Sequence, residues 1–574
     1  MTMFRLLACA LALIPLCGAE VRAQWEFVSD SIALPAEMYD GDYAPGLSTV
    51  DVDGDGWDDL TFGSDLAGID LYLKDSLGFH EVVVDLGLQP GECQTRGVVW
   101  ADMDNDADQD LFINCQNGQD RVFRNLGGLQ MQDITDSCGI MLNPPSRSYG
   151  LSLADVNRDG FLDLFVCDAP EYEPFQPNGF YLGDGAGHFT LTEWGLPQDR
   201  FRASHQSRFF DINGDDLLDL YVLNDREHQA NELYLGTETG FVDVGEEWGL
   251  DVYTDAMGMA WIDEEHDNRL EVYMTGIDEA FFMKDTGGFS FVDYAPEYGM
   301  PTELVTGWSI VGADFDNDGW EDLYVNSSHA LVYPVPPSLE PQINVWMHNE
   351  QGTGWLDRSS ELPAEAQFAE VFVMAPADWN QDGVVDLAAL EVGSDALLLE
   401  GQPQSGHWLE VQPRGTESNR DGTGTRVIAY VTDESGEVIR RERQSSCGQG
   451  FLAQYTRWLH FGLGEADVID SLELRWPLGQ VEMLYDVAVD QRLLLIEGDN
   501  APPCAALDTY TPSLCNCPAD LNGDALVGSS DLLMALSSFG EAAAGIVGDV
   551  DEDGIVGVND ILDLLSLYGI NCLD

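Results

Sequence analysis

An acidic ten-residue segment returns seven times in this chain, starting at residues 51, 102, 155, 211, 263, 314 and 378. Its first copy reads DVDGDGWDDL and its sixth reads DFDNDGWEDL. Successive copies start 51, 53, 56, 52, 51 and 64 residues apart. A period of about fifty, filled with short strand-like runs and Gly, Asn and Asp turns, is typical of a β-propeller with one blade per repeat. The sequence therefore predicts a mainly β fold whose first part is a seven-bladed β-propeller.

Each repeat has room for four short strands. A run such as GVVWA leads into the acidic segment, a run such as LFINC leaves it, and two more runs follow. The seventh repeat lacks the fourth run before the composition changes near residue 406. The segment WEFVSDSIALP, Trp25 to Pro35, resembles the fourth-strand segment WLDRSSELP of the sixth repeat. We therefore expect the N-terminal segment to complete the last blade and close the ring.

The spacing of oxygen-bearing side chains in the acidic segment predicts structural calcium. In the first copy, Asp51, Asp53, Asp55 and Asp59 fill positions one, three, five and nine, and the Trp57 carbonyl stands at position seven. Glycine at position six permits a tight turn, and flexible all-oxygen loops suit Ca²⁺ better than Mg²⁺, which demands octahedral geometry. The other candidate ligands of the seven loops are Asp102, Asp104, Asp106, Asp110, Asp155, Asn157, Asp159, Asp163, Asp211, Asn213, Asp215, Asp219, Asp263, Glu265, Asp267, Glu271, Asp314, Asp316, Asp318, Asp322, Asp378, Asn380, Asp382 and Asp386.

Two interpretations of these loops stand at this point. They are calcium sites, or they are polar turns in which Asp, Asn and Gly are common anyway. Seven copies in register favour calcium. The fifth loop departs from the others, because Glu265 and Glu271 are longer than Asp and Asn268 replaces glycine. We expect this loop to hold its ion differently or not at all.

Residues 24–402 resemble the FG-GAP (VCBS) repeat family, whose units form the propellers of integrin alpha chains and of many secreted bacterial proteins. The resemblance rests on the repeated acidic segments quoted above. For that family such loops imply structural calcium on one rim of the propeller and no catalysis.

Residues 403–498 read as a small β domain. Alternating apolar residues in RVIAYV and SLELRW indicate strands, and SNRDGTG, LHFGLG and RWPLGQ resemble the ASPIC/UnbV module. Asn419 to Gly424 form either a binding loop or a tight turn, and the turn is favoured.

A Pro- and Cys-containing linker, residues 499–516, precedes two loops that resemble EF-hand loops. Each loop runs into an apolar helical pattern, so residues 517–574 resemble a dockerin, which implies a calcium-dependent cohesin-like partner. A calcium-stapled miniature domain that packs on its own propeller is the alternative. The candidate ligands in these two loops are Asp520, Asn522, Asp524, Asp531, Asp549, Asp551, Asp553 and Asp560.

Composition and the N-terminal targeting pattern indicate where the protein is located and which partners its charge excludes. Residues 1–23 read as a secretory signal peptide cleaved after Ala19 or Ala23, which predicts a secreted or cell-surface protein. The 24 basic residues face 103 acidic ones, a formal charge of -79 that repels nucleic acid. In an oxidising compartment, Cys93 and Cys115 are one candidate disulfide, Cys138 and Cys167 are another, and Cys447 is an odd residue left over.

No catalytic motif stands out in the sequence, since it lacks H-E-x-x-H, G-x-S-x-G and a P-loop. We therefore expect a non-enzymatic, calcium-binding interaction or adhesion protein that binds an extracellular protein or polysaccharide and is attached through its C-terminus. The alternatives are a polysaccharide-active hydrolase or lyase, or an accessory subunit of one, carried by a dockerin, and a structural surface-layer component.

Overall fold

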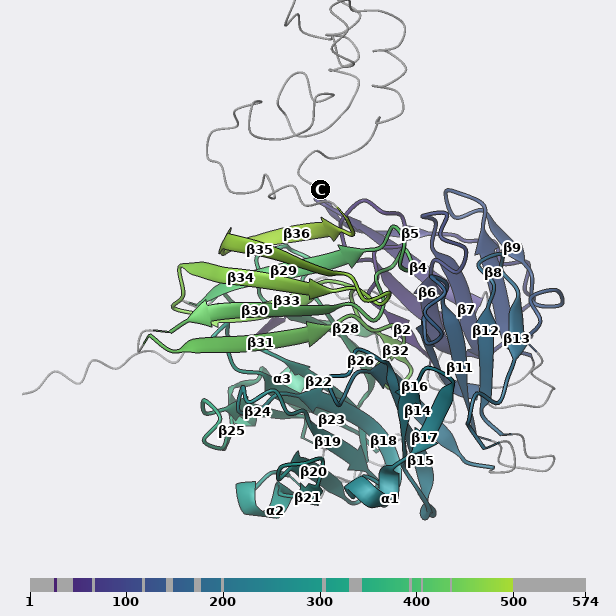
Figure 1. Ribbon diagram of the computed structural model, residues 1–574. Helices are drawn as coiled ribbons and strands as arrows, with labels where there is room; N and C mark the ends of the chain where they lie inside the picture. Colours follow the sequence, from purple (N-terminus) through teal and green to yellow (C-terminus); the bar gives the residue numbers. More distant parts are fainter. Residues whose placement is uncertain are drawn as a thin grey trace, which may run out of the picture.

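The structure is a computed structural model of the 574-residue chain. It describes residues 25–27, 45–64, 68–115, 119–140, 148–169, 177–197, 201–301, 306–329, 343–391, 395–403, 406–433 and 436–498. These residues form a mainly β fold (Figure 1), as the sequence predicts. The predicted signal peptide and the two C-terminal EF-hand-like loops lie outside the described residues.

The acidic repeats build four-stranded antiparallel units, which we call sheets and number in chain order; sheets 4 and 5 also pair with each other and form one eight-stranded sheet. Sheets 1 to 3 are formed by β2 (Leu47–Ser48), β3 (Leu60–Ser64), β4 (Gly68–Asp75) and β5 (Gly78–Val82); β6 (Thr95–Ala101), β7 (Asp110–Cys115), β8 (Arg121–Asn125) and β9 (Met131–Asp133); and β10 (Ser148–Ala154), β11 (Asp163–Asp168), β12 (Gly179–Gly183) and β13 (Phe189–Leu191). Sheets 4 and 5 are formed by β14 (Ser204–Phe210), β15 (Asp219–Ala230), β16 (Glu232–Thr237) and β17 (Gly240–Asp243); and β18 (Tyr253–Ile262), β19 (Glu271–Gly276), β20 (Ala280–Asp285) and β21 (Phe291–Asp293).

Sheets 6 and 7 complete the series. They are formed by β22 (Gly307–Ala313), β23 (Asp322–Ser327), β24 (Val345–Asn349) and β25 (Trp355–Asp357); and β26 (Val371–Ala377), β27 (Asp386–Glu391), β28 (Ala396–Gly401) and β1 (Trp25–Phe27). The short helices between sheets are α1 (Gly245–Trp248), α2 (Ala295–Tyr298), η2 (Ser359–Glu361) and α3 (Ala364–Gln367). Strand β1 pairs with β28 in antiparallel register, which confirms that the N-terminal segment supplies the fourth strand of the last sheet.

The sheets follow one another in a closed ring. The first strands of successive sheets are in contact from β2 to β26, and β26 contacts β2. Glycines permit this approach, because a Cβ on Gly97 or Gly150 would lie 3.0 or 2.8 Å from a carbonyl oxygen of the next sheet. A separate apolar cluster fills the space between each pair of neighbouring sheets, the last of them between sheets 7 and 1.

The C-terminal strands form a second, smaller β unit beside the ring (Figure 1). One of its sheets has the order β33-β29-β36 and the other β31-β30-β34-β35, with a shared apolar core. We call this unit the cap domain. Its strands are β29 (His407–Arg414), β30 (Arg426–Thr432), β31 (Val438–Gln444), β33 (Leu459–Gly464), β34 (Val468–Arg475), β35 (Val481–Ala488) and β36 (Gln491–Ile496).

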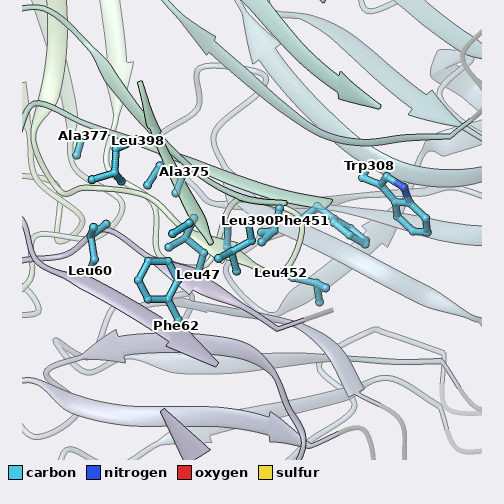
Figure 2. Close-up of a cluster of buried hydrophobic side chains, with 14 of the residues drawn as sticks. Leu47, Leu60, Phe62, Trp308, Ala375, Ala377, Leu390, Leu398, Phe451 and Leu452 are labelled. Atoms are coloured by element: carbon cyan, nitrogen blue, oxygen red, sulfur yellow. The ribbon is translucent and has the colours of Figure 1, made fainter. Parts of the chain in front are cut away.

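One segment of the cap domain, residues 445–456, enters the middle of the ring; we call it the axial segment. Its strand β32 (Ala453–Gln454) pairs in parallel with β2 and contacts β6 and β26. Phe451 is buried among side chains of sheets 1, 6 and 7 (Figure 2), and its ring lies 5.7 Å from that of Trp308. The Gln454 side chain accepts from the N–H of Trp100 and donates to its carbonyl, which ties the segment to sheet 2. The cap domain is thus fixed to the ring through its centre.

One of the two predicted disulfides is present and the other is not. Cys93 and Cys115 form a disulfide, which confirms that pair. Cys138 and Cys167 are buried and free, so the second candidate bridge is wrong. Cys167 lies against Gly150 of the inner strand, whereas Cys138 donates to the Thr135 carbonyl on the outer side of its sheet. Cys447 is free and buried in the axial segment. Among the described residues, no helix is long and apolar enough to cross a membrane.

Candidate metal loops

Each acidic segment forms the connection between the first and second strands of its sheet, and its fold repeats seven times. The position-six N–H donates to the position-one carboxylate at 2.7 to 3.1 Å in all seven loops. The position-seven N–H donates to the position-five carboxylate at 2.9 to 3.0 Å in all seven. These local bonds explain why Asp occupies both positions, since its short side chain reaches the backbone of its own turn.

Backbone conformation repeats in the same way. Positions four and six have positive φ in every loop. Glycine supplies this at position six in four loops, as the sequence predicts, whereas Ala107, Asp216 and Asn268 adopt it elsewhere. Six of the seven copies hold a non-glycine residue at positive φ, a strain typical of ligand-binding turns.

The position-nine carboxylate anchors the loop to its sheet. In at least six of the seven loops it accepts the N–H of position two, and in at least six it accepts an N–H from the third strand. Asp59, for example, accepts from Val52 and Lys74 at 2.8 and 2.7 Å. The carboxylate is therefore held in place before any ion binds.

Three loops bring carboxylate oxygens within 4.8 Å of one another. These groups are Asp51, Asp53 and Asp59; Asp102, Asp104 and Asp110; and Asp314, Asp316 and Asp318. Loops three, four and seven carry Asn at position three, and its amide donates to the position-five carboxylate, as from Asn157 to Asp159 at 2.9 Å. The predicted donors of loops one, two and six thus converge as all-oxygen sets, the chemistry that Ca²⁺ prefers.

The position-nine carboxylates of all seven loops are buried. Burial, and then repulsion from Asp51 and Asp53, raises the pKa of Asp59 to about 9. Burial likewise raises the pKa of Asp110, Asp163 and Asp219 to about 8. A buried carboxyl holds its proton near neutral pH unless a cation compensates its charge. The loops therefore need either protons or a metal.

Two protein cations, Lys284 and Arg269, are paired with acidic residues of the fifth loop. The ammonium group of Lys284 lies 2.7 Å from Glu265 and 2.9 Å from the buried Glu264, and Arg269 is paired with Asp267. The longer Glu side chains reach across to the third strand, where Lys284 is located. This arrangement explains how the fifth loop departs from the pattern.

Residues outside the acidic segments complete several loops, and the sequence reasoning missed them. Arg124 is paired with Asp104 in the second loop, and Arg426 of the cap domain lies 2.6 Å from Asp211 in the fourth. His348 Nε2 lies 3.1 Å from Asp316 Oδ2 in the sixth loop, so this loop includes a nitrogen donor. Strand register is the signal that could have revealed these residues. Arg124, Lys284 and His348 occupy the same place on the third strand of their sheets.

The stretch Asn419 to Gly424 is a turn that docks on the second loop. Asn419 accepts the Thr423 N–H and donates to its carbonyl, and Gly422 and Gly424 have positive φ. Asp421 accepts the N–H of Asp102 at 2.9 Å. The structure therefore supports the turn interpretation. The predicted ligands Asp520, Asn522, Asp524, Asp531, Asp549, Asp551, Asp553 and Asp560 lie outside the described residues.

Two known families match parts of the chain. The FG-GAP-like repeat matches residues 102–166, and the family described as ASPIC and UnbV matches residues 415–502. The chain thus carries an FG-GAP-like repeat in sheets 2 and 3 and an ASPIC/UnbV domain in the cap domain.

Among curated proteins, the chain is similar to cartilage acidic protein 1. The Xenopus tropicalis protein is 24% identical over 474 residues, which are 76% of this chain and 70% of the relative. The Mus musculus protein is 24% identical over 512 residues, covering 82% and 76%. Among solved structures, BBS1N in complex with ARL6DN superposes with a TM-score of 0.41 at 11% identity, over 67% of this chain and 99% of that one. An Agrocybe aegerita protein described by its recognition of non-reducing terminal N-acetylglucosamine gives a TM-score of 0.37 at 17% identity, over 55% and 78%.

Proposed function

We propose that the protein is a secreted interaction scaffold: a seven-bladed, calcium-stabilised β-propeller capped by its ASPIC/UnbV domain. The observation that carries the proposal is the sevenfold repetition of one loop structure, with the same backbone bonds and the same two positive-φ positions. Buried carboxylates that converge without a cation are costly, and a divalent ion removes that cost. Structural calcium would thus stabilise one rim of the ring.

Calcium also suits the place that we propose for the protein. The similarity to cartilage acidic protein 1 supports an extracellular setting, where calcium is abundant. We propose that the ring or the cap domain binds an extracellular protein or polysaccharide. Residues 517–574 would attach the chain to a cohesin-like partner through their own calcium loops. We propose no enzymatic activity, because the sequence contains no recognised catalytic motif.

Calcium binding is tested by ion counting. Native mass spectrometry should show fewer bound Ca²⁺ ions in an Asp55→Asn variant than in the wild type, because position five is Asp in all seven loops and the first loop loses that charge. Asp85→Asn is the matched control, since Asp85 is an exposed acid outside the loops whose carboxylate accepts the Gly87 N–H. Calcium that is absent from the wild type, or lost equally from both variants, would contradict the scaffold proposal.

The interaction role is tested by capture. The full chain and a version ending at Gly498 are each exposed to secreted proteins and polysaccharides, in calcium and in chelator. Retention by both forms would place binding on the ring or the cap domain. Retention by the full chain alone, in calcium, would place it on residues 499–574. If neither form retains anything, the interaction role is wrong.

A further inference from the structure

A cavity of about 510 Å³ lies between the ring and the cap domain. Sheets 4 to 7 supply one wall, and strands β31 and β33 with the axial segment supply the other. The volume falls in the range of small-molecule sites, well above that of a single water. The position between two units is also one where such sites are common.

The charges on the cavity wall are paired, with one exception. Arg426 pairs with Asp211 and Glu442, Arg440 with Glu442, Arg269 with Asp267, Arg443 with Glu321, and Glu410 with Arg492. The backbone N–H groups of the turns satisfy Asp263 and Asp285. Arg208 is the exception, because no described carboxylate lies within ion-pair distance of its guanidinium.

Arg208 lies on β14, half-buried at the cavity wall, where burial lowers its pKa. Its guanidinium is 5.7 Å from the Phe210 ring, and its buried Nε has no hydrogen-bond partner among the described residues. Glu321, the acid that acts on it electrostatically, is held elsewhere, 3.4 Å from Arg443 and bonded to the Asp263 N–H. A planar, permanently charged fork in such a place suits a carboxylate, which it binds through two parallel hydrogen bonds.

Other polar atoms around the cavity also lack partners. The indole nitrogens of Trp261 and Trp458 have no acceptor within the described residues, and Gln449 Oε1 has no donor. His460 Nε2 lies 3.1 Å from the Gly383 carbonyl, and burial lowers the pKa of this ring to about 4. The ring is therefore neutral at pH 7, so Nε2 donates and the unpartnered Nδ1 is an acceptor.

This set of two donors and two acceptors beside aromatic side chains matches a compact molecule that carries several hydroxyl groups. The unpartnered atoms are covered by their neighbours as the side chains stand, and rotation toward a bound hydroxyl would satisfy them.

We propose that the cavity is a binding site for a small hydroxylated carboxylate of monosaccharide size, a uronic acid, with Arg208 holding the carboxylate and the tryptophans and His460 holding hydroxyls. This inference goes beyond the calcium scaffold and does not depend on it.

The test is calorimetric titration of the full chain, in saturating calcium, with D-glucuronate and with D-glucose. D-Glucuronate carries a carboxylate where D-glucose carries a hydroxymethyl group. Glucuronate should bind about tenfold or more tighter than glucose, because only it can pair with Arg208. Arg208→Met should remove that preference, with glucuronate affinity falling about tenfold or more.

Two controls keep the result interpretable. Arg420→Met changes an arginine outside the cavity and should leave binding unchanged. The melting temperature of Arg208→Met should equal or exceed that of the wild type, because the change removes an unpaired charge; Trp458→Phe offers a second, milder variant that loses one donor. Absence of glucuronate binding, equal binding of the two sugars, or full binding by Arg208→Met would each overturn the proposal.

Discussion

Calcium binding to the acidic loops should release protons. Without a cation, the position-nine carboxyls Asp59, Asp110, Asp163 and Asp219 have pKa values of about 8 to 9. A carboxyl of pKa 8 is about nine-tenths protonated at pH 7. A metal binds the ionised form, so each of these loops should release about one proton when it is filled at that pH.

The cost of removing that proton sets the expected affinity change. At pH 7 it is about 1.4 kcal/mol for a group of pKa 8, so the apparent affinity of such a loop should fall about tenfold for each pH unit below 8. The assay is calorimetric titration of chelator-treated protein with Ca²⁺ in PIPES and in Tris at pH 7. The two buffers take up protons with different enthalpies, so the observed heats should differ. Equal heats in both buffers would refute the reasoning, because no protons would then be exchanged.

The same pKa shifts give the sign of the pH dependence of stability in the cation-free protein. In the unfolded chain these carboxyls titrate at about their ordinary value of 3.8, whereas in the folded chain they keep their protons up to pH 8 or 9. The folded state binds more protons, so the contribution of these carboxyls to the free energy of unfolding is greatest below pH 3.8, falls as pH rises above that value and is lost above pH 8 to 9. Each group contributes about 1.4 kcal/mol per pH unit near pH 7. Urea unfolding in chelator should therefore show lower stability at pH 8 than at pH 7.

Three further outcomes are expected. Lys284→Ala leaves the buried Glu264 without its cation and should lower the free energy of unfolding by about 3–5 kcal/mol in urea titrations, whereas His80→Ala, which breaks an exposed pair, should cost less than about 1 kcal/mol. Phe451→Ala empties a site at the centre of the ring and should cost about 3–5 kcal/mol; a loss below about 1 kcal/mol would contradict the anchoring role of the axial segment. Burial lowers the pKa of His205 and His266 to about 3, below the ordinary 6.5. The calcium-loaded protein should therefore lose stability as pH falls from 6.5, by about 1.5 kcal/mol per histidine at pH 5. Stability that holds constant over this range would contradict their burial as neutral rings.

The repeat made much of the fold predictable, because the relevant signals are local and return at the same place. Asp at positions one and five bonds to the backbone of its own turn, so the acidic segment marks each strand connection. The likeness of the Trp25 segment to a fourth strand correctly placed β1 beside β28. The axial segment could not be foreseen in this way, since Phe451 and Gln454 bond to sheets that are hundreds of residues away in the chain.

The cations that neutralise the acidic loops could not be predicted from the local sequence. A pattern of carboxylates predicts where negative charge collects, but it does not predict which group neutralises that charge. In the fifth loop the answer is Lys284, which comes from the third strand of the same sheet; in the fourth, Arg426 of the cap domain contributes from beyond the ring. Both cations were visible in the sequence, but only the pairing of strands brings them to the acids. A loop that has its own cation has less need of a metal, so the fifth loop should be the last to fill as calcium is added.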